Sequence, residues 1–104
     1  MVNSSGIRPV GVRILVLPDV IEETTVGGII LAKEYTNKEK MAQIKGTLVA
    51  VGDHAWEDYS TPWAVVGDRV IIGKYSGLIE TGRDEKEYRI VNDKDLVCVI
   101  EEMV

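Results

Sequence analysis

Short apolar runs rich in Val, Ile and Leu recur along the chain and are separated by turn-forming residues. Each run is stopped by Gly, Pro, Asn or Asp, which is typical of β-strands bounded by turns. No long helix is evident between the runs. The pattern therefore predicts strands at residues 12–17, 46–51, 68–73, 78–81, 87–91 and 95–101.

Several short strands with turns between them favour an all-β barrel or sandwich, formed by a single domain spanning residues 1–104. Residues 81–87, TGRDEKE, predict a hairpin turn, and residues 91–95, VNDKD, predict a turn into the last strand. The reason is that Asn, Asp and Gly tolerate the backbone angles of turns. Two intervals, about 22–45 and about 53–65, do not follow the strand pattern. We interpret both as excursions from the barrel.

The overall charge narrows the classes of partner. The chain has 104 residues, a formal net charge of -5 and a pI near 4.8. Nucleic acid requires a clustered basic face, so neither nucleic acid nor an anionic membrane surface is an expected partner.

No apolar run approaches the roughly 18 residues of a membrane-spanning helix, and the first residues, MVNSSGIRPV, lack the pattern of a secretory signal. The single Cys agrees with a cytoplasmic protein, because small secreted domains usually carry several paired cysteines.

Cys98 lies in the last predicted strand, where it alternates with Leu96 and Ile100. Residues two apart in a strand point to the same face. A free cysteine in such a position usually behaves as a small apolar residue. We therefore expect the Cys98 side chain to be buried.

His54 is the only histidine, and it lies close in sequence to Glu57 and Asp58. One imidazole and two carboxylates could hold a divalent cation, but the second His or the cysteines of typical zinc sites are missing. A solvated loop is therefore the expectation. The adjacent acids Glu22 and Glu23 point to opposite faces of a strand and cannot form an acid–base pair. We expect no enzyme activity, no catalytic residues, no cofactor and no metal site.

Five segments occur in the order, and nearly at the spacing, of one protein family: IRPVGVRILVL, GGIIL, GTLVAVG, VGDRVIIGKYSG and DLVCVIEE. They run from Ile7 to about Glu102 and resemble the GroES-type co-chaperonins of the chaperonin-10 family. The resemblance implies an irregular β-barrel with a mobile loop and a roof hairpin, assembled as a seven-membered ring. It implies a dome-shaped lid that caps an ATP-driven double-ring chaperonin. The implied partners are a chaperonin-60 ring with bound nucleotide, unfolded substrate proteins inside the cage and further copies of the chain.

The resemblance assigns residues from about 22 to 45 to the mobile loop that binds the chaperonin. The matching docking residues are Gly27, Gly28, Ile29, Ile30 and Leu31. Two adjacent glycines suit such a loop, because glycine adopts backbone angles closed to other residues and loses much conformational entropy on ordering. The alternative, from the residues alone, is that GGIILA forms another core strand after a turn.

Strand edges left open by the barrel invite pairing with another chain. We expect the segment around Ile7–Pro9 to pair with the last strand, Leu96–Ile100, of the next subunit. The candidate interface residues are Ile7, Arg8, Pro9, Leu96, Val97, Cys98, Val99 and Ile100. Repeated head-to-tail, this contact closes a ring, and the resemblance implies a heptamer.

The family's roof hairpin corresponds to residues from about 53 to 65, and Tyr75 resembles the aromatic residue near the inner wall of the dome. The candidate roof and cavity residues are Trp56, Tyr59, Trp63 and Tyr75. Two alternatives are open. The loop aromatics could form a local cluster beside Pro62 instead of contacting a neighbouring subunit, and Tyr75 could pack in the core.

Some positions depart from the family pattern, among them Gly11-Val12 and Leu17-Pro18. They indicate a divergent member, and such divergence suits a virus-encoded co-chaperonin acting in the host cytoplasm. The competing function is a monomeric SH3-like or OB-like binding barrel that uses the aromatic loop as a stacking face. A small hydrolase is a more distant alternative, because the sequence lacks the polar cluster it would need.

Overall fold

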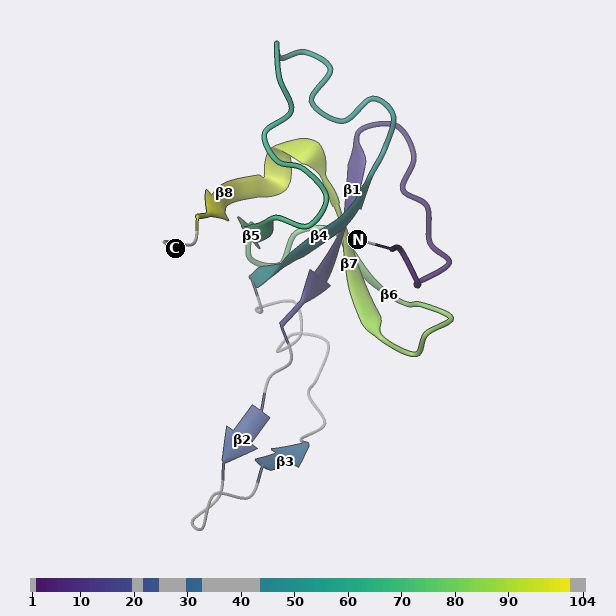
Figure 1. Cartoon of the computed structure of the whole chain (residues 1–104), viewed down its shortest axis with the longest axis vertical. Helices are drawn as coiled ribbons and strands as arrows, with labels where there is room; N and C mark the ends of the chain where they lie inside the picture. Colours follow the sequence, from purple (N-terminus) through teal and green to yellow (C-terminus); the bar gives the residue numbers. More distant parts are fainter. Residues whose placement is uncertain (1, 20–21, 25–29, 33–43, 102–104) are drawn as a thin grey trace.

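The chain forms a barrel of six strands and a separate two-stranded ribbon (Figure 1). The computed structural model describes residues 2–19, 22–24, 30–32 and 44–101. The strands are β1 (Arg13–Pro18), β2 (Glu22–Thr24), β3 (Ile30–Ala32), β4 (Lys45–Val51), β5 (Arg69–Ile72), β6 (Leu78–Thr81), β7 (Glu87–Asn92) and β8 (Leu96–Ile100). A 3-10 helix, η1 (Asp93–Asp95), precedes β8. No helix in these ranges is long and apolar enough to cross a membrane.

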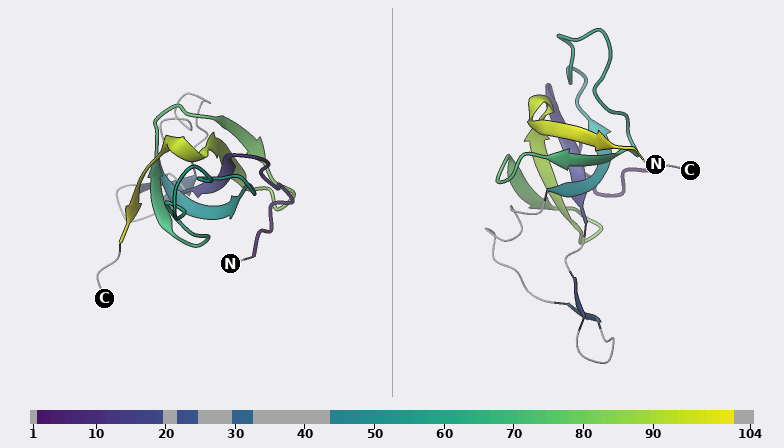
Figure 2. Two further views of the ribbon diagram at one scale, coloured as in Figure 1. Left: turned by 90° about the horizontal axis from the view of Figure 1, so that it is seen from above. Right: turned by 90° about the vertical axis from the view of Figure 1, so that its left-hand side faces the viewer.

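Six strands form one antiparallel sheet in the order β6-β7-β1-β4-β5-β8. Viewed from above, the strands curve around a common centre (Figure 2). The outer strands, β6 and β8, each have one strand partner among the described residues. The all-β prediction is confirmed, and each predicted barrel strand agrees with the observed one to within one residue at either end.

Apolar clusters cover both faces of the central strand β1. Ile14, Leu15 and Val16 are all fully buried, although successive strand residues point to opposite faces. Ile14 and Val16 belong to one cluster, whose other buried members are Leu48, Trp56, Ala64, Val70, Ile72, Val91 and Leu96. Leu15 belongs to a second cluster with Val49 and Tyr88, against which pack Ile7, Leu17, Ala50 and Ile90. Since both faces of β1 are covered, its buried side chains on both faces are apolar. The strand therefore appears in the sequence as a continuous apolar run and not as an alternation of apolar and polar residues.

A β-bulge shifts the register between β1 and β4. Leu15 pairs with Ala50, whereas Val16 pairs with Leu48, so Val49 is the extra residue. A bulge inserts one unpaired residue and changes which side chains share a face. Val49 and Ala50 consequently lie in the same cluster although they are adjacent in sequence.

A second bulge, in β8, makes the prediction for Cys98 wrong. The pairing of β8 with β5 shifts by one residue between Cys98 and Leu96, so Val97 is the extra residue. Leu96 is buried in the core, and Val99 packs against the same cluster. In a regular strand, residues three positions apart point to opposite faces. Because the bulge adds one residue, Leu96 and Val99 both point into the core, and the side chains of Val97 and Cys98 between them are exposed.

The two turns and the second excursion are present. Gly82 N–H donates to the Lys86 carbonyl (2.8 Å) in the turn between β6 and β7, and η1 forms the turn into β8. Residues 52–68 join β4 to β5 through successive turns and contain no strand, so the segment expected as a hairpin is an irregular loop without a strand ladder. In Figure 1 this loop and the β2–β3 ribbon extend from opposite ends of the barrel.

Candidate functional site

Within the predicted docking loop, residues 22–24 and 30–32 form a two-stranded ribbon, whereas Lys45 already belongs to the barrel strand β4. Glu23 of β2 lies opposite Leu31 of β3, and Thr24 lies opposite Ile30. The six-stranded sheet includes neither β2 nor β3. Ile30 and Leu31 therefore do not form a barrel strand, which removes the alternative stated for GGIILA. Gly27, Gly28 and Ile29 lie outside the described residues, and the docking role stays a prediction.

The segment between β1 and β4 leaves and re-enters the barrel at a neck formed by Pro18, Asp19, Lys45 and Gly46. Pro18 pairs with Gly46, and Asp19 N–H donates to the Lys45 carbonyl (2.9 Å). A side chain at position 46 is excluded by the close approach of the strands, because a Cβ there would lie 2.5 Å from the Leu17 carbonyl oxygen. The two ends of the segment are thus held side by side.

β8 is the exposed edge at which the predicted subunit contact would form. Val97 is 65% exposed, and Cys98 is also exposed. Leu96 and Val99 point to the barrel's own core, and Ile100 is half-buried. A neighbouring chain could therefore contact the Val97 and Cys98 side chains, whereas Leu96 is available only through its backbone.

The N-terminal segment is partly committed to its own barrel. Ile7 packs against the second cluster, its N–H binds Ser5 Oγ (2.9 Å), and its carbonyl accepts from Asn3 Nδ2 (2.7 Å). Pro9 is buried and Arg8 is exposed. Of Ile7, Arg8 and Pro9, Arg8 is therefore the one whose side chain lies open to solvent.

Trp56 is a core residue rather than a roof residue. Its side chain is 2% exposed, and its φ angle of 56° is uncommon for any residue but glycine. Two hydrogen bonds to the buried Asp93 hold it: the backbone N–H donates to Oδ2 (2.7 Å), and Nε1 donates to the backbone carbonyl (2.9 Å). The Trp56 ring therefore belongs to the core cluster of the barrel and not to the exposed face of the loop.

The remaining aromatics of the 52–68 loop pack on this anchor. The Trp63 ring stacks on Trp56 at 6.2 Å between centroids, and Tyr59 lies 5.0 Å from Trp63. Tyr59 and Trp63 are 45% and 38% exposed. Trp63 contacts both other rings, and because Trp56 is buried, a stacking platform of all three rings is not available.

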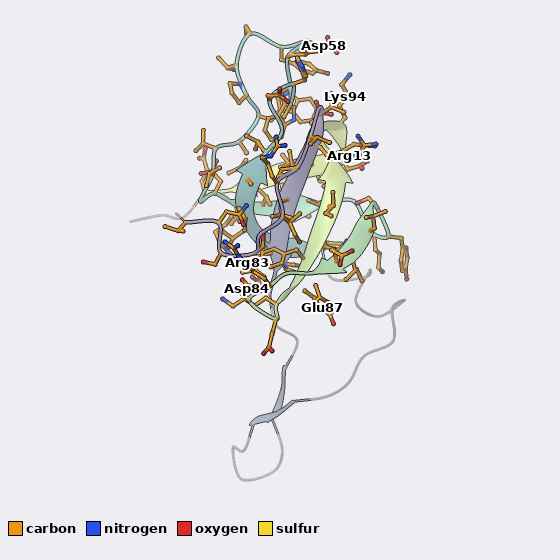
Figure 3. All side chains as sticks on the ribbon, turned by 90° about the vertical axis from the view of Figure 1, so that its right-hand side faces the viewer. Arg13, Asp58, Arg83, Asp84, Glu87 and Lys94 are labelled. Carbon is orange, nitrogen blue, oxygen red and sulfur yellow. The ribbon has the colours of Figure 1, made fainter. Side chains whose placement is uncertain are left out.

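A salt bridge joins the loop to η1 beside this cluster. Lys94 Nζ lies 3.3 Å from Asp58 Oδ2 and 5.9 Å from the centre of the Tyr59 ring. The hydrogen bond to Asp58 raises the pKa of Lys94. Figure 3 shows Asp58 and Lys94 close together at this end of the barrel, with Arg83 and Asp84 at the other. The loop therefore touches the element that leads into the edge strand β8.

Tyr75 lies on the surface of the turn between β5 and β6, which removes the core-packing alternative. It is 49% exposed, has a φ angle of 63° and carries Lys74 Nζ at 5.7 Å from its ring centre. The turn is held by Ser76 Oγ, which donates to the Gly73 carbonyl (2.6 Å), and by Arg89, which donates to the Ser76 carbonyl. The surface position is compatible with the predicted place on the cavity wall.

His54, in the 52–68 loop, forms an exposed ion pair. Its Nδ1 lies 2.6 Å from Glu57 Oε2, and its Nε2 lies 3.9 Å from Asp53 Oδ2. The hydrogen bond with Glu57 raises the pKa of His54. Over the described ranges no three His, Cys, Asp or Glu side chains converge as they would around a metal ion.

Two buried charged residues were not anticipated from the sequence. Asp93 is 4% exposed and Arg89 is 1% exposed. Arg89 alternates with Val91, so its inward direction could have been inferred from strand parity, but a charged side chain there argues against burial. For Asp93 the sequence gave no indication of burial, because its hydrogen-bond partner Trp56 is 37 positions away.

Comparison with known proteins agrees with this geometry. Residues 6–100 match the family described as Chaperonin 10 Kd subunit. Similar proteins include the Co-chaperonin GroES of Phocaeicola vulgatus, which is 40% identical over 91% of this chain and 98% of its own length. The Co-chaperonin GroES of Lactobacillus delbrueckii subsp. bulgaricus is 37% identical over 90% and 98%, and that of Thermosipho melanesiensis is 40% identical over 92% and 98%. The chain therefore belongs to the chaperonin 10 family.

Proposed function

We propose that this protein is a co-chaperonin that assembles into a heptameric, dome-shaped lid, caps an ATP-driven double-ring chaperonin in the cytoplasm and encloses unfolded proteins. The observation that carries the proposal is the family match over residues 6–100, combined with a β2–β3 ribbon that takes no part in the barrel sheet. The partner is a chaperonin-60 ring with bound nucleotide. The protein has no catalytic role in this proposal.

The docking element is the segment from about 22 to 45, acting as a mobile loop whose contact residues are Gly27, Gly28, Ile29, Ile30 and Leu31. Burying an Ile or Leu side chain contributes about 1.5–3 kcal/mol, so three contribute roughly 5–9 kcal/mol. Ordering five residues costs roughly 5–10 kcal/mol. One loop therefore binds weakly. Several loops on one ring bind tightly, because docking of the first raises the effective concentration of the others.

The subunit contact joins the edge strand β8 of one copy to the segment around Ile7–Pro9 of the next. Support comes from the exposed Val97 and Cys98 on β8 and from the single strand partner that β8 has in the described chain. Unpaired edge groups favour addition of another strand. The contact is heterologous, and such contacts close into a ring.

The 52–68 loop, at the end of the barrel remote from the ribbon in Figure 1, forms the roof. Tyr59 and Trp63 are the candidate surface aromatics of this loop, and Trp56 holds the loop to the barrel. Tyr75, in the turn between β5 and β6, is the candidate residue of the cavity wall. Replacing residues 57–62 by a short Asn-Gly turn should leave ring assembly and chaperonin binding intact while reducing encapsulation. Loss of chaperonin affinity in a variant that still forms rings would place the docking surface at this end instead.

The proposal is tested by native mass spectrometry of the ring with a chaperonin and nucleotide. Ile30→Ser removes about 2 kcal/mol of apolar burial per loop and is expected to abolish the complex while ring mass and unfolding temperature stay unchanged. Val65→Ser is the matched control, because Val65 is 61% exposed on the other excursion. A wild-type chain that remains monomeric, or an Ile30→Ser ring that binds normally, would refute the proposal.

A further inference from the structure

An arginine from a third strand joins the neck. Arg69 begins β5 and lies opposite Thr47 of β4. Its Nη1 donates to Asp19 Oδ1 and its Nη2 to Asp19 Oδ2, both at 2.6 Å, and Nη1 also donates to Thr47 Oγ1 at 3.2 Å. Asp19 is the first residue after β1, so the ion pair is formed at the point where the chain leaves the barrel.

The ion pair between Arg69 and Asp19 restrains the orientation of the Asp19 side chain as well as its distance from β5. Two parallel charge-assisted hydrogen bonds fix the plane of a carboxylate, and the planar guanidinium presents its donors in a rigid fork. The backbone N–H of Asp19 is bound at the same time to the Lys45 carbonyl (2.9 Å). Backbone and side chain of Asp19 are thus tied to two different strands, and rotation about its N–Cα bond must break one of the two contacts, so the direction of its Cα–C bond is restrained.

The ion pair is too exposed to act mainly as a stabiliser. The Arg69 and Asp19 side chains are 32% and 37% exposed, and ion pairs in such positions contribute little to folding. The hydrogen bond from Arg69 lowers the pKa of Asp19, and the charges of Arg69 and Lys45 act in the same direction. The carboxylate is therefore ionised, and the fork intact, at neutral pH.

We propose that Asp19 and Arg69 are positioning residues, which set the direction in which the chain leaves the barrel towards β2. The inference rests on the proposed function, in which β3 carries docking residues. A fixed exit direction keeps the docking segments of all copies within reach of their sites on one chaperonin ring. Effective concentration is highest when the span of a connection matches the separation of the sites, so a loosened neck lowers the affinity of the whole ring.

The direct test measures the spread of directions in the full-length protein. Spin labels are placed at Thr24→Cys in β2 and Thr81→Cys in β6, with Cys98→Ser to remove the exposed thiol, and labelled chain is diluted with unlabelled chain. The distance distribution is expected to be broader in Asp19→Ala than in the wild-type protein and to keep the wild-type width in Asp19→Glu, which keeps a carboxylate. Asp58→Ala, which breaks the exposed pair with Lys94 far from the neck, is the matched control. An unchanged distribution in Asp19→Ala would overturn the proposal.

The second test measures affinity of the unlabelled ring for a nucleotide-bound chaperonin. Asp19→Ala is expected to weaken binding about tenfold or more, because a small loss at each neck multiplies over the copies of the ring, while ring mass and unfolding temperature stay unchanged. Asp19→Glu should restore most of the affinity. If Ile30→Ser abolishes binding and Asp19→Ala binds as wild type does, the positioning role is refuted and the proposed function stands. If wild-type rings bind no chaperonin, the proposed function fails, and the distance measurement alone decides whether the fork orients β2.

Discussion

Replacing Trp56 by Ala removes the side chain that joins the 52–68 loop to the barrel. The indole is 2% exposed in the main core cluster, and its Nε1 donates to the buried carbonyl of Asp93 (2.9 Å). Truncation of a buried aromatic residue to Ala typically costs about 3–5 kcal/mol. For a domain of this size each kcal/mol lowers the unfolding temperature by about 4–8 °C, so the expected fall is roughly 12–40 °C.

The same substitution at Trp63 provides a matched control. Trp63 is 38% exposed and contributes chiefly its ring contacts with Trp56 and Tyr59. Aromatic pairs are worth about 0.5–1.5 kcal/mol each, so Trp63→Ala is expected to cost about 1–3 kcal/mol. The two variants are compared by thermal and urea unfolding at one protomer concentration, because assembly adds to apparent stability.

Fluorescence gives an independent measurement, since each variant retains one of the two tryptophans. The emission of Trp56 in Trp63→Ala should be blue-shifted and poorly quenched by acrylamide, whereas that of Trp63 in Trp56→Ala should be readily quenched. Equal losses of stability in the two variants, together with equal quenching, would refute the assignment of Trp56 to the core.

Three further outcomes are expected. Gly46→Ala should destabilise the barrel by about 1–3 kcal/mol or more, because its Cβ would lie 2.5 Å from the Leu17 carbonyl oxygen; a variant with wild-type unfolding temperature would contradict the close approach. Burial and the hydrogen bond with Asp84 raise the pKa of Tyr88 to about 12. The unfolded chain loses this phenolic proton near pH 10 and the folded chain near pH 12, so stability should fall between these values; urea titrations of Tyr88→Phe should lack that part of the pH dependence. Cys98, exposed on the isolated chain, should react rapidly with a thiol reagent in dilute protomers and slowly in rings, and equal rates would exclude it from the subunit contact.

The barrel strands could be predicted because their determinants are local. Strand alternation and turn residues are properties of neighbouring positions, and the buried run Ile14–Val16 is legible as an uninterrupted apolar stretch. The five family segments also fixed the order of the elements. The residues of the predicted docking loop and subunit edge were named on the same basis, and their roles remain predictions.

Tertiary contacts decided the features that sequence reasoning missed. A bulge is selected by the fit between two strands, so strand parity alone placed Cys98 on the wrong face. Trp56 and Asp93 are 37 positions apart, and Asp19 and Arg69 are 50 apart. Hydrophobic and turn patterns specify where strands begin and end, but a hydrogen bond between distant residues depends on the register and curvature of the whole sheet. The sequence therefore determined the strands and the family, whereas the folded barrel determined which side chains anchor its loop and its neck.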